Sequence, residues 1–226
     1  MSSLENPILD ALEPRTRTRL LERSVPRRLA KGEFLYLAGD REPRVHVVVE
    51  GLLKFVGRDG SGVETTVGLA VSGDTAGEIA ALDDLPQPLD AVAVVPTVVR
   101  GFAADAFMSA VTSDPDATAV FHTQMAARLR WAYAMTQERS TSEVGARLAG
   151  RLLDLADILG RVSGGVVEFE MPMAQADLGQ LAGMCRESTC KTLRSFKRDG
   201  IVDYRNRRLR ILRPDVLERI RCAGRA

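Results

Sequence analysis

Residues 175–196 constrain the fold of this chain most, because their pattern predicts two short helices that break at Gly183. The opposite face of the second helix carries charged side chains that suit base edges and phosphates in a major groove. The pattern indicates a helix-turn-helix, with an ordinary helical hairpin and a solvated basic face as the alternative. The apolar positions at helical spacing are Leu178, Leu181 and Ala182 before the break and Thr189, Leu193 and Phe196 after it, and the charged positions are Arg186, Glu187, Lys191 and Arg194.

The segment after this motif predicts a small β-hairpin. Asp199-Gly200 ends the second helix, Ile201-Val202 begins a strand, and an arginine-rich turn leads into a second alternating strand. Between residues 186 and 213, ten basic residues stand against three acidic ones, a net charge of +7. A winged helix-turn-helix that binds a polyanion accounts for both the order of the elements and the charge.

The net charge of the whole chain does not show this local excess, because the 31 basic and 30 acidic residues nearly cancel. Residues 1–138 have a charge balance of −5 and residues 139–226 a balance of +6, which predicts a sensing or assembly domain before the basic domain. A chain of 226 residues is long enough for two cores. The sequence shows neither a long apolar run nor a signal peptide, so we expect a cytoplasmic protein without a membrane partner.

Residues for catalysis or metal binding are not grouped in the sequence. Cys185 and Cys190 lack the spacing of a zinc knuckle, and three cysteines in all, with Cys222, argue against a disulfide framework. His46 falls in an alternating strand and His122 in a helix, without neighbouring ligands. We therefore expect no metal site and no enzyme. A redox or metal role of Cys185 and Cys190 is kept as an alternative.

The N-terminal half has the pattern of a β-rich domain. Short amphipathic helices come first, one of them beginning at Glu13-Pro14. Asp59-Gly60 predicts a hairpin turn between two of the strands that follow. Many short strands at near-regular spacing indicate a sandwich or a rolled barrel. The predicted strands cover residues 33–37, 45–51, 52–56, 63–69, 91–95 and 98–102.

A long helix is predicted after Asp114-Pro115, because neither proline nor glycine interrupts residues 116–144. It has two apolar stripes, so one can face the β-rich domain while the other faces a second copy of the helix. Plain core packing of both stripes is the alternative. A leucine-rich helix follows from Ser142-Glu143, and residues 166–171 predict a strand. The stripes are Phe121, Met125, Leu129 and Ala132 on one side and Ala127, Trp131 and Ala134 on the other.

This order of elements resembles the CRP/FNR family of bacterial transcription regulators over nearly the full length. Residues 31–40 and 47–51 are similar to the family's opening strands, residues 72–82 to its phosphate-binding cassette, and residues 178–188 to its DNA-recognition hairpin. The resemblance implies an α+β fold. Its parts are an N-terminal β-roll like the cyclic-nucleotide-binding jelly roll (residues 1–113), a long dimerisation helix (residues 114–138) and a C-terminal winged helix-turn-helix (residues 139–226).

The resemblance also implies a homodimer that binds double-stranded DNA at an inverted repeat and that acts on RNA polymerase. Arg186, Glu187 and Lys191 fall where the cyclic-AMP-responsive members carry their base-contacting residues. We expect Gln175, Arg205, Arg207 and Arg208 to bind phosphates. The candidate DNA-binding residues are therefore Gln175, Arg186, Glu187, Ser188, Lys191, Arg205, Arg207 and Arg208.

The effector site departs from the family pattern. Gly77 and Glu78 match the cassette, but residues 86–90 (Pro-Gln-Pro-Leu-Asp) stand where the family has an arginine for the phosphate, and Ala132 and Tyr133 replace its adenine-contacting pair. We expect a degenerate pocket and a nucleotide effector other than cyclic AMP in the usual mode, or no effector at all. Arg100 or Arg128 reaching inward is the alternative source of a cation. The candidate effector-binding residues are Gly77, Glu78, Gln87 and Tyr133.

One other function stays open beside DNA-dependent regulation. The chain could be a cyclic-nucleotide-responsive module that acts through a protein partner, with the helix-turn-helix serving as the docking surface.

Overall fold

The computed structural model describes residues 6–41, 43–58, 60, 64–141, 143–171 and 173–223. The chain divides into two compact units, Met1–Trp131 and Ala132–Ala226. Helix α5 (Pro115–Thr141) begins in the first unit and ends in the second. Among the described residues, no helix is both long enough and apolar enough to cross a membrane.

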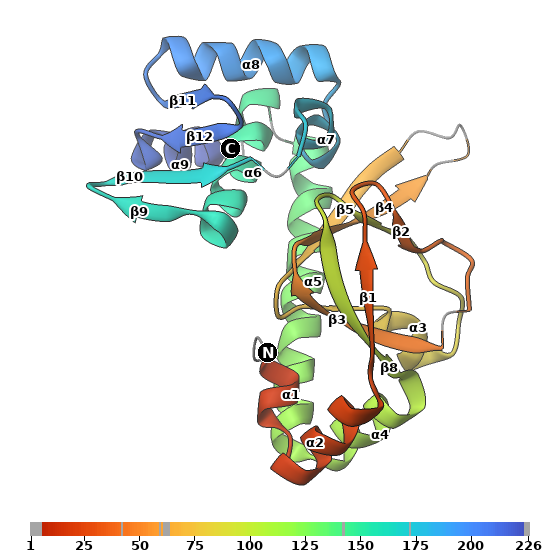
Figure 1. Cartoon of the computed structure of the whole chain (residues 1–226). Coiled ribbons are helices and arrows are strands. Elements are labelled where there is room, and N and C mark those ends of the chain that lie inside the picture. Colours follow the sequence, from red (N-terminus) through yellow and green to blue (C-terminus); the bar gives the residue numbers. More distant parts are fainter. Residues whose placement is uncertain are drawn as a thin grey trace. The chain divides into compact units, whose positions relative to one another are not determined.

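Two four-stranded antiparallel sheets form the roll of the first unit (Figure 1). Their strand orders are β1-β8-β3-β6 and β2-β7-β4-β5. The strands are β1 (Val25–Leu29), β2 (Phe34–Tyr36), β3 (Arg44–Glu50), β4 (Leu52–Arg58), β5 (Glu64–Val71), β6 (Thr75–Ala76), β7 (Asp90–Ala93) and β8 (Thr97–Ala103).

Apolar side chains of both sheets pack into one cluster, which includes Leu29 and Val48 from the first sheet and Leu35 and Leu53 from the second. This packing confirms the predicted rolled β-domain. Strands β4 and β5 pair out to Arg58 and Glu64 as the hairpin prediction required, while the expected turn at Asp59 falls outside the described residues. The sequence did not indicate β1 or β6 as strands.

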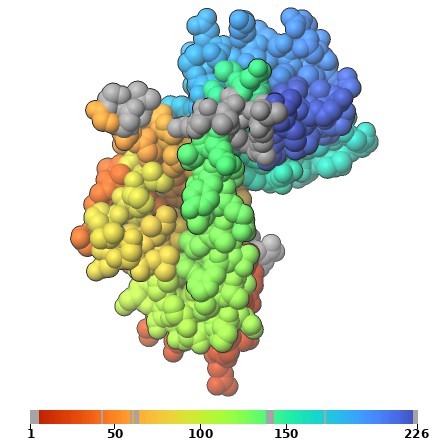
Figure 2. All heavy atoms as spheres, turned by 180° about the vertical axis from the view of Figure 1, so that it is seen from behind, coloured from red at the N-terminus to blue at the C-terminus, as the bar shows by residue number. Residues whose placement is uncertain are grey.

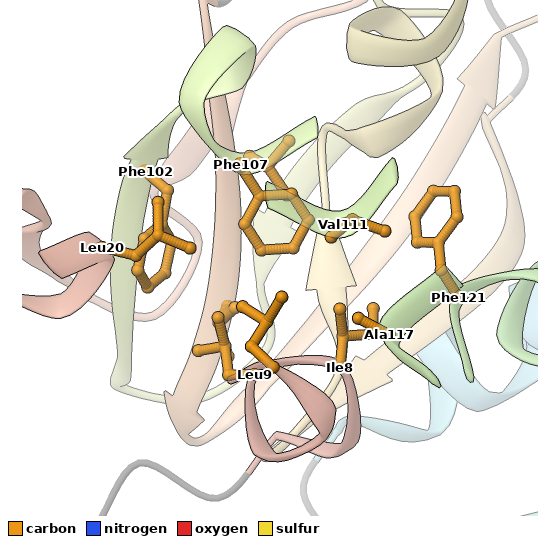
Figure 3. Packing of buried hydrophobic residues seen from close by; sticks show 11 residues of the cluster. Ile8, Leu9, Leu20, Phe102, Phe107, Val111, Ala117 and Phe121 are labelled. Atoms are coloured by element: carbon orange, nitrogen blue, oxygen red, sulfur yellow. The ribbon is translucent and has the colours of Figure 1, made fainter. Parts of the chain in front are cut away.

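Helices cover one end of the roll. They are α1 (Pro7–Ala11), α2 (Pro14–Arg23), α4 (Ala104–Ser113) and the first turns of α5, and their side chains interlock around Phe102 and Phe107 (Figure 3). The ring centroids of these two phenylalanines are 5.7 Å apart. Phe121 of α5 joins the cluster, so the beginning of the long helix is fixed to the roll.

The helix starts follow the predicted caps. A Glu13 carboxylate oxygen accepts from Thr16 N at the start of α2, and Asp114 Oδ1 accepts from the backbone N–H groups of Asp116 and Ala117 at the start of α5. Several N–H hydrogen bonds lower the pKa of the Asp114 carboxyl, that of Ala117 foremost. Side-chain oxygens at these positions satisfy N–H groups that a helix cannot bond internally.

The second unit holds a sheet of order β11-β12-β10-β9 and the helices packed on it. The predicted leucine-rich helix is present as α6, and its Leu148, Leu152 and Leu155 are fully buried. Strand β9 was not expected, because in this region the sequence indicated a strand only at residues 166–171. The elements are α6 (Val144–Leu159), β9 (Arg161–Ser163), β10 (Val166–Glu170), α7 (Gln175–Leu181), α8 (Arg186–Arg198), β11 (Val202–Arg205), β12 (Arg208–Ile211) and α9 (Pro214–Ala223).

Candidate nucleic-acid interface and effector region

The two helices of the predicted motif, α7 and α8, meet at a close contact. Gly179 of α7 faces α8 with no room for a side chain, since a Cβ there would lie 2.6 Å from Thr189 Oγ1 and 3.0 Å from Met184 O. Between the helices Gly183 has a φ of +62°, a left-handed conformation that favours glycine. The sequence prediction of a helix break at Gly183 is confirmed.

Helix α8 separates an apolar face from a charged one. Thr189, Leu193 and Phe196 are buried, as predicted. The charged residues Arg186, Glu187, Lys191 and Arg194 are all exposed, and among the described residues none is paired with their side chains. Unpaired side chains of both signs on one exposed helix face can bond to base edges without first breaking another contact.

Two contacts flank the charged face of α8. The Cys190 thiol donates to Gln175 Oε1 at 2.9 Å, so the first residue of α7 is tied to the middle of α8. Cys185 Sγ lies 3.2 Å from Ser188 Oγ. The hydrogen bond of the Ser188 side chain, with those of the Ser188 and Glu187 backbone N–H groups, lowers the pKa of the Cys185 thiol. All three cysteines are free.

The predicted wing is present as the hairpin β11–β12. Asn206 and Arg207 form its turn with φ values of +49° and +66°, the backbone form that two-residue hairpins prefer. Arg205, Arg207 and Arg208 are all exposed. The Lys197 ammonium lies 2.8 Å from Asp203 Oδ1 and 4.9 Å from the centre of the Tyr204 ring, which fixes the end of α8 to this hairpin.

Strand β10 places two carboxylates, Glu168 and Glu170, beside the wing. The net charge counted for residues 186–213 does not include them. In register, Glu170 faces Arg208 and Glu168 faces Arg210. Arg208 Nη1 lies 3.4 Å from Glu168 Oε1 and Arg207 Nε lies 3.8 Å from Glu170 Oε1. These exposed ion pairs are worth little in water, about 0–1 kcal/mol each, so a phosphate can compete for either arginine.

In the first unit the effector candidates Gly77 and Glu78 lie where β6 leads into α3 (Glu78–Asp83). Gly77 has a φ of +90° and leaves no space for a side chain, because a Cβ would lie 2.8 Å from Arg44 O. The Glu78 side chain is only 2% exposed, and its Oε1 accepts from Arg128 Nη1 of α5. Figure 2 shows yellow atoms of this part of the roll beside the green atoms of α5.

Arg128 makes further contacts in the same place. Its Nη2 donates to the Thr75 carbonyl oxygen at 2.5 Å, and its guanidinium lies 5.9 Å from the centre of the Phe55 ring. The sequence comparison with the family pattern had shown no cation near Gly77 and Glu78, because residues 86–90 lack the family's arginine. The structure corrects that expectation through the alternative source, Arg128, whereas Arg100 lies on β8 opposite Val47.

The negative charge in residues 86–90 is not left uncompensated. Asp90 is buried, but its charge is balanced, since Oδ2 lies 2.5 Å from Arg58 Nη1 and Oδ1 accepts from Ala38 N at 2.7 Å. Gln87 is 3% exposed, and its Nε2 lies 3.4 Å from where a Cβ on Gly77 would stand. The structure thus brings Gly77, Glu78 and Gln87 together. Tyr133 is 62% exposed and belongs to the second unit.

The two histidines differ in their exposure. His46 is buried on β3 against Gly101, and burial, aided by the charges of Arg27 and Arg44, lowers its pKa to about 4. His122 is exposed on α5. In the part of the chain that the structure describes, no group of three or more His, Cys, Asp or Glu side chains could hold a metal ion.

A β-roll with a long following helix and a separate winged helix-turn-helix defines a class of DNA-binding proteins that couple a sensing domain to a DNA-recognition domain. Family comparison agrees with each half. Residues 26–114 match the cyclic nucleotide-binding domain, and residues 146–220 match the Crp-like helix-turn-helix domain. The chain belongs to the CRP/FNR family and is a DNA-binding transcription regulator of that type.

Individual relatives support this assignment. The chain is similar to the CRP-like cAMP-activated global transcriptional regulator of Mycobacterium tuberculosis, with 24% identity over 85% of this chain and 86% of that protein. It is also similar to the transcriptional regulator LdrP of Thermus thermophilus, with 28% identity over 85% of this chain and 95% of that protein. The structure of FixK2 from Bradyrhizobium japonicum has the same fold, with a TM-score of 0.78 at 22% identity over 87% of this chain and 96% of that one.

Proposed function

We propose that this regulator binds an inverted repeat in double-stranded DNA as a homodimer and that it does so without cyclic AMP. The DNA part rests on the surface of α8. Its buried face fixes the helix, and its exposed side chains of Arg186, Glu187 and Lys191 have no partner in the described part of the chain. Arg and Lys are suited to guanine and Glu to cytosine. Each good base contact contributes about 1–3 kcal/mol of discrimination.

Phosphate binding falls to the residues around this surface. Gln175 begins α7, and its amide nitrogen is available because Cys190 bonds to the amide oxygen. Arg205 of the wing has no partner among the described residues, whereas Arg207 and Arg208 would exchange a carboxylate for a phosphate. Ser188 lies in the first turn of α8, where a helix N-terminus favours anions.

The dimer is supported by apolar side chains left exposed on α5 and α3. Leu129 is 52% exposed on α5, and Ile79 and Leu82 of α3 are 44% and 52% exposed. A second copy of the same surface would bury them. Two recognition helices in one dimer would enter successive major grooves about 34 Å apart. Sedimentation that shows a monomer at micromolar concentration, with and without DNA, would contradict the dimer.

Independence from cyclic AMP is supported by the contacts of Glu78. The carboxylate expected to accept a ribose hydroxyl already bonds to Arg128, and the nearby Asp90 is held by Arg58. A nucleotide phosphate that recruited Arg128 would leave Glu78 buried and unpaired, which costs several kcal/mol. The Glu78–Arg128 ion pair therefore joins α5 to the roll through side chains of the chain itself. We expect this arrangement to be competent for DNA.

The proposed localisation and protein partner follow from the role in transcription. A transcription regulator acts where DNA and RNA polymerase are, so we place this protein in the cytoplasm with RNA polymerase as its partner. We propose no catalytic activity. The roll remains compatible with an effector other than cyclic AMP, since Gly77 and Gln87 lie next to each other there.

Selection of binding sites from a random DNA pool tests the proposal. The wild-type protein, with and without cyclic AMP, is expected to enrich one inverted repeat with half-sites one helical turn apart, to the same extent in both conditions. Isothermal titration with cyclic AMP should show no tight binding. Enrichment only in the presence of cyclic AMP would contradict the effector proposal. A pool that stays random, together with capture of a protein partner, would favour the docking alternative.

A further inference from the structure

The end of α7 has a specific hydrogen-bond pattern that does not include all the carbonyl oxygens of the turn. Met184 N donates to Gly179 O at 2.8 Å and Gly183 N donates to Gln180 O at 3.2 Å. This is the Schellman arrangement, in which a left-handed glycine ends the helix. It uses carbonyls further back in α7, so the carbonyl oxygens of Ala182 and Gly183 still need donors.

Those donors come from another helix. Arg147 of α6 donates from Nε to Ala182 O at 3.0 Å and from Nη2 to Gly183 O at 3.3 Å. Arg147 lies in the first turn of α6, where its own N–H bonds to Glu143 O, and its side chain spans from there to the turn between α7 and α8. One guanidinium thus holds two successive carbonyls.

An arginine has the geometry that this position needs. Its donors have a fixed planar arrangement, so two carbonyls bonded to it are fixed relative to each other and to α6. A positive charge is also favourable at the carboxyl end of a helix. Lysine could bond to one of the carbonyls but could not impose the same geometry on both.

The position of α8 depends on this turn. Only Met184 and Cys185 separate Gly183 from Arg186, the first residue of the recognition helix. A change in the direction of the Ala182 and Gly183 peptides therefore moves the start of α8 and, with it, the base-contacting side chains. Displacements of about an ångström are enough to break hydrogen bonds to base edges, because their strength depends steeply on distance and angle.

We infer that Arg147 is a positioning residue for DNA recognition: it holds the turn of the helix-turn-helix and thereby sets where α8 begins. The inference rests on the proposed function, since it assigns Arg147 an effect on base recognition by α8. Arg147 itself does not contact the DNA. Its loss therefore lowers the preference for the specific site and leaves phosphate binding in place.

The test compares Arg147→Met and Arg147→Lys with wild type, in binding to the selected inverted repeat and to random DNA over a range of salt concentrations. Arg219→Met is the matched control, because it removes one arginine from an exposed position of α9, where Asp215 is its partner. For Arg147→Met we expect the ratio of specific to random affinity to fall about tenfold, as for one lost base contact. Arg147→Lys should lose less, and the control should keep the wild-type ratio.

The salt dependence separates positioning from direct contact. The slope of log affinity against log salt should stay at the wild-type value in Arg147→Met, whereas a slope smaller by about one would show a lost phosphate contact and overturn the inference. An unchanged affinity ratio in Arg147→Met would overturn it as well.

Amide hydrogen exchange tests the turn without DNA. The Met184 amide should exchange about tenfold faster in Arg147→Met than in wild type, with Arg147→Lys between them. Equal exchange in all three proteins would overturn the inference. Wild-type protein without any sequence preference would instead contradict the proposed function, and the exchange measurement distinguishes the two failures.

Discussion

Replacing Arg128 with Met tests the ion pair that joins α5 to the roll. The side chains of Glu78 and Arg128 are 2% and 29% exposed, so the variant leaves a buried carboxylate without its guanidinium. Removing one member of a buried pair costs about 3–5 kcal/mol. Because Arg128 is partly open to water, which can enter in its place, we expect the lower end, about 3 kcal/mol.

A double-mutant cycle isolates the pair. We expect Arg128→Met/Glu78→Gln to recover much of the stability lost in Arg128→Met, because no charge is then left buried alone. Urea unfolding followed through Trp131, the only tryptophan and a residue of α5, measures each free energy. If the two single effects add to within about 0.5 kcal/mol, the residues are not coupled and the account of this region is wrong.

Three further predictions concern single residues. His46 has a pKa of about 4 in the folded state and about 6.5 in the unfolded state, so the unfolded state takes up a proton first as the pH falls. Acidification from pH 7 to 4.5 should therefore destabilise wild type by roughly 2 kcal/mol more than His46→Gln, as urea midpoints at both pH values would show. Cys190→Ala should weaken binding to random and specific DNA alike by releasing Gln175, and Cys190→Ser should restore it, as gel-shift titrations would show. Gly179→Ala should cost about 1–3 kcal/mol in thermal unfolding of the second unit, because its methyl group would meet Thr189 and the Met184 carbonyl.

The parts of the fold that local pattern determines could be predicted from the sequence. The break at Gly183, the buried face of α8 through Leu193 and the cap at Asp114 each depend on residues within a few positions of one another. Helical spacing and capping chemistry are local properties, so a single sequence shows them.

Contacts between distant segments could not be predicted in this way. Glu78 and Arg128 are 50 positions apart, and the sequence register around residue 88 suggested that no cation was present. Glu168 and Glu170 reduce the charge of the wing only because β10 pairs with β12 in one register. Arg147 is 35 positions from Ala182, and no local pattern relates them. In each case tertiary packing determines the partner of a charged side chain.

We propose that α8 recognises base sequence while the wing holds phosphates. The most direct measurement is the ratio of affinities for the selected inverted repeat and for random DNA in wild type, Arg186→Ala and Arg205→Ala. Arg186→Ala should lower this ratio roughly 5- to 150-fold, the equivalent of about 1–3 kcal/mol. Arg205→Ala should lower both affinities together and reduce the salt slope by about one. A ratio that survives Arg186→Ala and falls in Arg205→Ala would contradict the account.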